Sequence, residues 1–261
     1  MSPALSNADN APGSLAKQAD RILFVLFLLL FLIVQVRLIL RSPNLGFARW
    51  PEGLFLLITA AYSLLILARE LPWQNVLAAS GLIALLSCIS EWLAVRSQTF
   101  FSYPTTLDAA WAVPLFWVVA ILNARSVARL TLFNRRNSPF YGLLLLGFAM
   151  LLATVFRIGL VSVCTTCFNA SQASLWPMAL YWMLTATLAL VFASPWLLNK
   201  RPIETKPSFQ PLTIWILLNL LLITASLFTR SWLITIMLVL TAVPILRLAL
   251  TGRFLNKLDP L

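Results

Sequence analysis

The sequence predicts an all-α protein, a polytopic bundle of about eight transmembrane helices. Apolar residues make up 61% of the 261-residue chain and charged residues only 10%, whereas soluble domains average about 45–50% and about 25%. The apolar residues form long runs between residues 22 and 250, each long enough to cross a bilayer as a helix. The runs lack the apolar–polar alternation of a barrel strand, so helices are the expected spanning element.

The first predicted helix covers residues 22–40, which open with an unbroken apolar run from Ile22 to Val34. The second covers 53–68 and the third 76–95. A spanning helix takes about 20 apolar residues. An arrangement with seven crossings, in which one early segment lies at the membrane interface, therefore stays open beside the arrangement with eight.

The later predicted helices cover residues 109–124, 141–163, 176–198, 211–228 and 232–250. Proline together with tryptophan marks several helix starts, because proline suits the first helical turn and tryptophan suits the head-group level. These pairs are Pro72 with Trp73, Pro114 with Trp117, and Pro211 with Trp215.

The chain reads as one membrane domain over residues 21–252, with a polar N-terminal tail over 1–20 and a C-terminal tail over 253–261. The first twenty residues are too long and polar for the charged region of a signal peptide. No small-residue cleavage pattern follows the first apolar run, so we expect the first helix to be retained.

Positive charges predict the orientation. Thirteen lysines and arginines fall on the side of the N-terminus and five on the other side. The thirteen are Lys17, Arg21, Arg69, Arg125, Arg129, Arg135, Arg136, Lys200, Arg201, Lys206, Arg247, Arg253 and Lys257. The five are Arg37, Arg41, Arg49, Arg96 and Arg230. By the positive-inside rule both termini are cytoplasmic, in a bacterial inner membrane. Arg125 and Arg129 are expected to extend to the cytoplasmic surface.

Composition also excludes classes of function. The chain has no histidine and only three cysteines, which argues against imidazole-held cofactors, Ser-His-Asp catalysis and a bound transition metal. No cofactor is expected. The net charge of +11 falls between the apolar runs, so we interpret it as attraction to membrane lipids and expect no nucleic-acid partner.

Glu91 and Arg157 are the two ionisable residues clearly inside predicted spans. Both lie about 8 to 9 Å below the same end of the bundle, at a helical rise of 1.5 Å per residue. We expect them to approach as an ion pair, because a lone charge at that depth is costly. The pair is either structural or part of a functional site, and Tyr103 and Asp108 in the following loop are expected beside it.

Cys164 and Cys167 form a Cys-x-x-Cys motif at the end of the fifth predicted helix. A disulfide or two free thiols is the simpler interpretation. A thiol oxidoreductase stays a distant alternative, since only Cys88 remains as a further thiol.

Several short motifs resemble a family, the multi-helix carotenoid biosynthesis membrane proteins, which include carotenoid 1,2-hydratases and bisanhydrobacterioruberin hydratases. The motifs are EWLAVR (91–96), FSYP (101–104), AVPLFW (112–117), NARSVAR (123–129), FASPWLLNK (192–200) and FQPLTIWILLN (209–219). The resemblance covers about residues 50 to 230. It implies a hydrophobic polyene or isoprenoid ligand and addition of water to a terminal isoprenoid double bond.

The resemblance also implies roles for individual residues. Glu91 would protonate the alkene, and Asp108 or Tyr103 would orient the water. Trp111 and Trp117 would contribute aromatic substrate walls. The family has acidic residues where this chain has Arg157, which would then contact the substrate instead.

This difference keeps a second interpretation open, in which the protein does not catalyse a reaction. It would then bind the carotenoid or serve as a scaffold for other membrane proteins of the pathway.

Overall fold

The computed structural model describes residues 11–40, 50–96, 111–135, 138–163, 175–197 and 209–258. These ranges contain eight α-helices, one short 3-10 helix and no strand, which confirms the predicted all-α fold. The helices are α1 (Ala11–Leu40), α2 (Glu52–Ala68), α3 (Trp73–Arg96), α4 (Ala112–Thr131), η1 (Phe133–Arg135), α5 (Tyr141–Val163), α6 (Leu175–Leu197), α7 (Gln210–Phe228) and α8 (Trp232–Leu258).

Seven of the described helices are long and apolar enough to cross a membrane, and α2, with 17 residues, is shorter. Each predicted span falls on one of the eight helices. At both ends of the chain the helix runs beyond the predicted span: α1 begins at Ala11 and α8 continues to Leu258. A helix satisfies its own backbone hydrogen bonds, so it can continue past the hydrocarbon core.

The predicted end of the fourth helix, at residue 124, is wrong, because α4 continues to Thr131. Arg125 and Arg129 therefore lie inside a helix and not in a connection. Arg125 is buried, and Arg129 forms an ion pair with Glu70, which corrects the expectation that both arginines extend to the membrane surface. Helices packed around α4 cover these positions.

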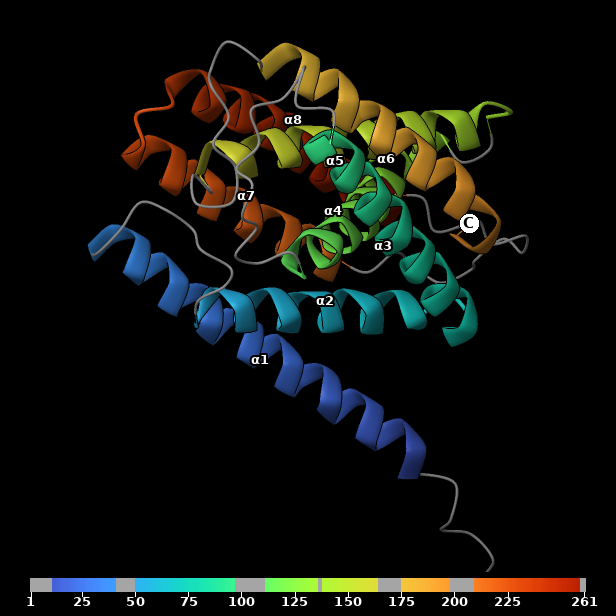
Figure 1. The fold of residues 1–261 in the computed structure, drawn as a ribbon. Helices are drawn as coiled ribbons and strands as arrows, with labels where there is room; N and C mark the ends of the chain where they lie inside the picture. Colours follow the sequence, from blue (N-terminus) through green and yellow to red (C-terminus); the bar gives the residue numbers. More distant parts are fainter. Residues whose placement is uncertain are drawn as a thin grey trace, which may run out of the picture.

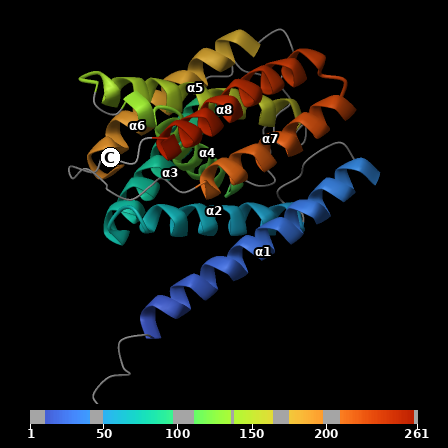
Figure 2. The same ribbon diagram turned by 180° about the vertical axis from the view of Figure 1, so that it is seen from behind.

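Helix α4 lies in the middle of the bundle and is buried along almost its whole length. It packs against α2, α3, α5, α7 and α8, and Figures 1 and 2 show the other helices arranged around it. Helix α1 lies at the edge, where it packs against α2 and α7. The bundle therefore has one central helix, and the residues on α4 face protein on all sides.

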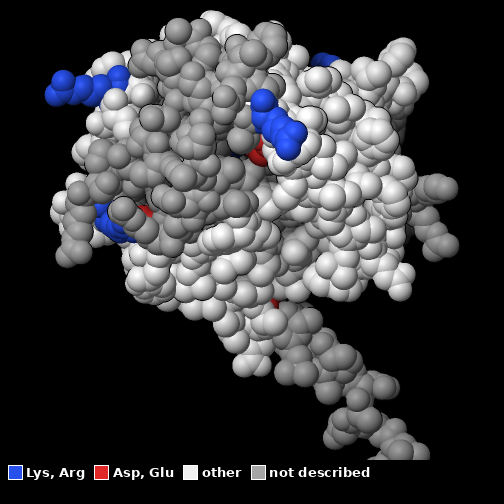
Figure 3. Space-filling view, in the orientation of Figure 1, with Lys and Arg blue, Asp and Glu red and all other residues white. Residues whose placement is uncertain are grey.

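The outer surface of the bundle is apolar. Large hydrophobic side chains of α1, α5, α6 and α8 are exposed, and Leu143, Leu233 and Leu240 each expose more than 60% of their surface. In Figure 3 the described part of this face carries charged side chains only at separated points. In water such a surface would be unfavourable, whereas lipid chains cover it at no cost. The protein is an integral membrane protein.

Two ion pairs set the relation between α1 and α2. Arg37 pairs with Glu52 at one end, and Asp20 pairs with Arg69 at the other. The two helices thus run in opposite directions, and α2 covers the length of α1 between Asp20 and Arg37, about 25 Å at 1.5 Å per residue. Although α2 is short, it lies beside a spanning helix over most of the hydrocarbon thickness.

Candidate functional site

Four helices contribute one large side chain each to a buried site at one end of the bundle. We call these residues, Glu91 of α3, Trp117 of α4, Arg157 of α5 and Trp182 of α6, the Glu91–Arg157 site. Each lies between five and seven residues from its helix terminus at that end. At 1.5 Å per residue this is about 8 to 10 Å along the helix axis. The four depths match because α3 and α5 end where α4 and α6 begin.

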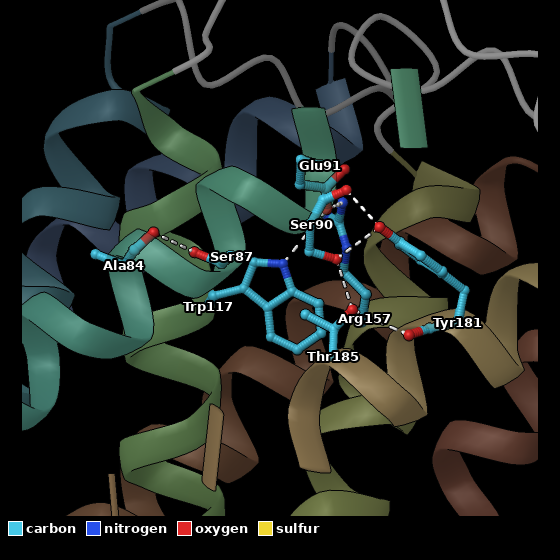
Figure 4. Close-up of polar contacts among 8 residues, drawn as sticks. All are labelled: Ala84, Ser87, Ser90, Glu91, Trp117, Arg157, Tyr181 and Thr185. Carbon is cyan, nitrogen blue, oxygen red and sulfur yellow. Dashed lines mark hydrogen bonds and ion pairs between the residues drawn. The ribbon is translucent and has the colours of Figure 1, made fainter. Parts of the chain in front are cut away.

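The predicted ion pair between Glu91 and Arg157 is confirmed. Nη2 of Arg157 donates a hydrogen bond to Oε1 of Glu91, and the two side chains are 0% and 7% exposed for Arg157 and Glu91 respectively. Nε1 of Trp117 donates to the same carboxylate oxygen over 3.3 Å. Figure 4 shows the three side chains converging from α3, α4 and α5. Two N–H donors, one from α4 and one from α5, therefore meet at a single carboxylate oxygen of α3.

The Arg157 guanidinium also contacts two tryptophan rings. Its Cζ atom lies 5.7 Å from the ring centroid of Trp117 and 5.2 Å from that of Trp182. Both distances are within the range of cation–π attraction, which strengthens when the groups are shielded from water. The guanidinium is therefore held by one carboxylate and two indole faces, without exposure to solvent.

A group of three hydroxyl side chains borders the site. Ser90, the residue before Glu91, donates to the Tyr181 hydroxyl over 2.9 Å, and its own hydroxyl lies 2.6 Å from that of Thr185. The Tyr181 hydroxyl donates in turn to the backbone carbonyl of Ser90. These bonds join α3 to α6 and fix the last turns of α3, which carry Glu91 (Figure 4).

The structure brings together only some of the residues that the sequence suggested. Trp117 lies in the site, whereas Trp111 lies just before α4 and exposes 44% of its surface. Trp111 makes no hydrogen bond or ring contact with the other described residues of the site. Tyr103, Asp108 and the cysteine pair at 164 and 167 lie outside the described residues.

Sequence reasoning missed Trp182 and Tyr181. The comparison of depths that linked Glu91 to Arg157 would also have found Trp182, because it lies seven residues after the start of α6. The indole Nε1 of Trp182 is buried and has no hydrogen-bond partner among the described residues. It is a hydrogen-bond donor beside the ion pair.

Every acid whose side chain the structure describes is paired with an arginine. The pairs are Asp20–Arg69, Glu52–Arg37, Glu70–Arg129 and Glu91–Arg157. The described residues contain no group of three His, Cys, Asp or Glu side chains that could hold a metal ion. Within the described part, chemistry at this end of the bundle would depend on a carboxylate already bonded to a guanidinium and an indole.

The fold and the apolar surface define the class, a polytopic helical membrane protein. In comparisons with protein-family models, curated proteins and solved structures, nothing matched this chain. The resemblance to carotenoid hydratases therefore depends on the sequence motifs alone and stays a prediction.

Proposed function

We propose that this protein binds a long isoprenoid polyene in the membrane, at the end of the bundle that carries the Glu91–Arg157 site, and does not hydrate it. One observation supports binding without hydration over a hydratase. The tryptophan faces that would stabilise a substrate cation already contact the Arg157 guanidinium. The polyene as ligand class follows from the sequence resemblance.

Hydration of an alkene needs a proton donor and surroundings that tolerate a tertiary cation. Glu91 accepts hydrogen bonds from Arg157 and Trp117 on one carboxylate oxygen, so two donors of the protein already bind that oxygen. A fixed guanidinium beside the alkene would also repel a developing carbocation. The geometry therefore suits a structural or ligand-positioning role for Glu91 better than proton donation.

A carotenoid hydratase is the second candidate, and the polar groups beside Glu91 favour it. The hydroxyls of Ser90, Tyr181 and Thr185 and the Trp182 indole N–H are hydrogen-bonding groups at the depth of the carboxylate. Such groups suit a bound water. In this version a substrate would separate Glu91 from Arg157 on entry.

We place the protein in a bacterial inner membrane with both termini cytoplasmic, as the distribution of lysine and arginine indicates. Its partners would be the polyene, membrane lipids and other membrane proteins of the same pathway. The exposed apolar helices leave wide surfaces for such contacts.

Expression in a carotenoid-producing host tests both candidates. Pigments are extracted from the membranes and from the purified protein, and mass spectrometry and absorption identify them. Unmodified pigment that purifies with the protein supports binding. A product heavier by one water, absent with Glu91→Gln, supports the hydratase.

Two tryptophan substitutions test whether the pigment binds at the Glu91–Arg157 site. Trp182→Leu removes a ring of the site, whereas Trp73→Leu removes an exposed ring at the start of α3, at the other end of the bundle. We expect bound pigment per folded protein to fall about tenfold with Trp182→Leu, by the scale of a buried aromatic contact, and to stay unchanged with Trp73→Leu. Equal loss in both variants, or no pigment and no product, would contradict the proposal.

A further inference from the structure

The end of the bundle opposite the Glu91–Arg157 site contains another buried arginine. Arg125 lies six residues before the end of α4, and only 4% of its surface is exposed. Its Nη2 donates to the backbone carbonyl of Leu197, the last residue of α6. Its Nε and Nη1 atoms are buried and have no hydrogen-bond partner among the described residues.

The charges around Arg125 do not balance within the described part of the chain. Arg129, one turn further along α4, forms its ion pair with Glu70. Tyr141, at the start of α5, interacts electrostatically with both arginines and with Glu70. The described cluster thus has two guanidiniums, one carboxylate and one phenol, which leaves one positive charge without a full counter-charge.

A backbone carbonyl does not replace that counter-charge. The last carbonyls of a helix carry a partial negative charge, and Leu197 offers one of them to Arg125. A buried guanidinium nevertheless needs further hydrogen-bond acceptors and an opposite charge, since its desolvation is costly. A negatively charged group that meets Arg125, Arg129 and Tyr141 would supply both.

We propose that Arg125, Arg129 and Tyr141 bind the phosphate group of an anionic phospholipid. Arginine binds phosphate oxygens through several N–H groups at once, and a tyrosine hydroxyl can donate to the same group. Helix α6 ends beside Arg125, and α4 ends and α5 begins at the same end of the bundle, which helices that cross the bilayer would place near a membrane surface. The net charge of the cluster selects an anionic lipid over a zwitterionic one.

Native mass spectrometry of the full chain tests the proposal. The protein is purified in detergent and titrated with phosphatidylglycerol or with phosphatidylcholine. We expect one phosphatidylglycerol molecule to stay bound preferentially. Arg125→Gln should weaken this retention at least about tenfold, the scale of one or two lost charged hydrogen bonds. Arg96→Gln is the matched control, because Arg96 lies at the other end of the bundle against the Trp92 ring.

Further measurements distinguish a loss of folding from a loss of lipid binding, and a bound lipid from a bound free anion. Circular dichroism and size-exclusion chromatography establish that Arg125→Gln is folded. If it is not, two milder variants should still weaken retention: Arg125→Lys, which keeps both charges but loses the planar guanidinium, and Arg129→Gln, which keeps the charge of Arg125. Thermal protection by inorganic phosphate that depends on Arg125, without retention of phosphatidylglycerol, would overturn the lipid as the source of the phosphate.

A counter-ion from the chain itself is the competing explanation. Glu204 belongs to residues 198–208, which lie outside the described part. If Glu204→Gln destabilises the protein as much as Arg125→Gln, and the wild-type protein shows no preference between the two lipids, the proposal is overturned. Preferential retention in the Glu204→Gln variant supports it.

Discussion

Replacing Glu91 by glutamine takes a carboxylate away from a fully buried guanidinium. Removing one partner of a buried ion pair costs about 3–5 kcal/mol, because the remaining charge keeps its desolvation penalty. We expect the Glu91→Gln variant to lose stability on this scale in denaturant titrations of the protein in detergent micelles.

Asp20→Asn is the matched control. Its partner Arg69 is 42% exposed, and exposed pairs contribute less than about 1 kcal/mol. If both substitutions cost the same, burial does not distinguish the two pairs and the structural role assigned to Glu91 is wrong.

The shape of the cation at position 157 is expected to matter as well as its charge. Arg157→Lys keeps the charge but replaces a planar guanidinium between two indole rings by a compact ammonium. We expect a loss of about 1–2 kcal/mol from the two cation–π contacts, less than for Glu91→Gln in the same titration.

Exchanging the two charges gives a sharper test of these contacts. Glu91→Arg combined with Arg157→Glu restores an ion pair but places a carboxylate against the electron-rich faces of Trp117 and Trp182. Stability should therefore be restored only in part. Full recovery would show that the indole faces contribute nothing to holding Arg157.

Counting residues from helix ends predicted the pairing of Glu91 with Arg157, because both helices run the same way and a lone charge at that depth is costly. The same reasoning failed at Arg125. An arginine near the end of an apolar run usually extends to the membrane surface. The sequence of the run does not show that α6 and its neighbours cover this position. Burial by other helices is information that a single helix sequence does not contain.

Apolar run length predicted the number and order of the helices, because crossing hydrocarbon imposes one length on every span. It misplaced the end of α4, where Asn123, Arg125 and Arg129 look like the start of a polar connection. Asn123 instead donates to the Ser63 hydroxyl of α2 over 2.8 Å. In a central helix polar residues bond neighbouring helices, so they do not mark its end.

Close packing of α5 against α7 and α8 depends on Gly159. A Cβ atom there would lie 3.1 Å from side-chain carbons of Leu222 and Leu238. Because these are ends of flexible side chains, we expect Gly159→Ala to cost little and Gly159→Leu to destabilise by about 1–3 kcal/mol, the usual cost of overpacking.

Gly147→Ala is the control for this helix, since nothing lies within 4 Å of the added Cβ. Alanine is a better helix former than glycine, so this variant should be neutral or slightly more stable. Thermal unfolding of the three variants in detergent compares them. A Gly159→Leu protein as stable as wild type would show that α5 does not approach α7 and α8 this closely.

At the scale of the whole molecule, apolar patterning does not tell which helices are neighbours. Helices that are apolar on all sides carry no stripe that marks an inner face. The structure puts α4 at the centre and α1 at the edge, although α1 contains the longest apolar run. Buried polar residues carry more of this information, since Trp117, Asn123 and Arg125 of α4 bond to α3, α2 and α6 respectively.

The same ion pairs make the topology testable. If α2 crosses the membrane beside α1, as the pairs at both its ends indicate, the eight helices put both termini on one side. Thirteen basic residues on that side against five on the other predict that it is the cytoplasmic side. Single cysteines introduced at Gln74 and Pro139 should then react with a membrane-impermeant thiol reagent only in inverted vesicles.

Cysteines at Trp50 and Ser231 should react only in intact spheroplasts. The parent protein, with serine at positions 88, 164 and 167, provides the unlabelled background. If α2 lay along the membrane surface, positions 50 and 74 would be labelled from the same side, and positions 139 and 231 would exchange sides relative to the N-terminus. Such a pattern would contradict eight crossings, because seven spans would then separate the termini and place them on opposite sides of the membrane.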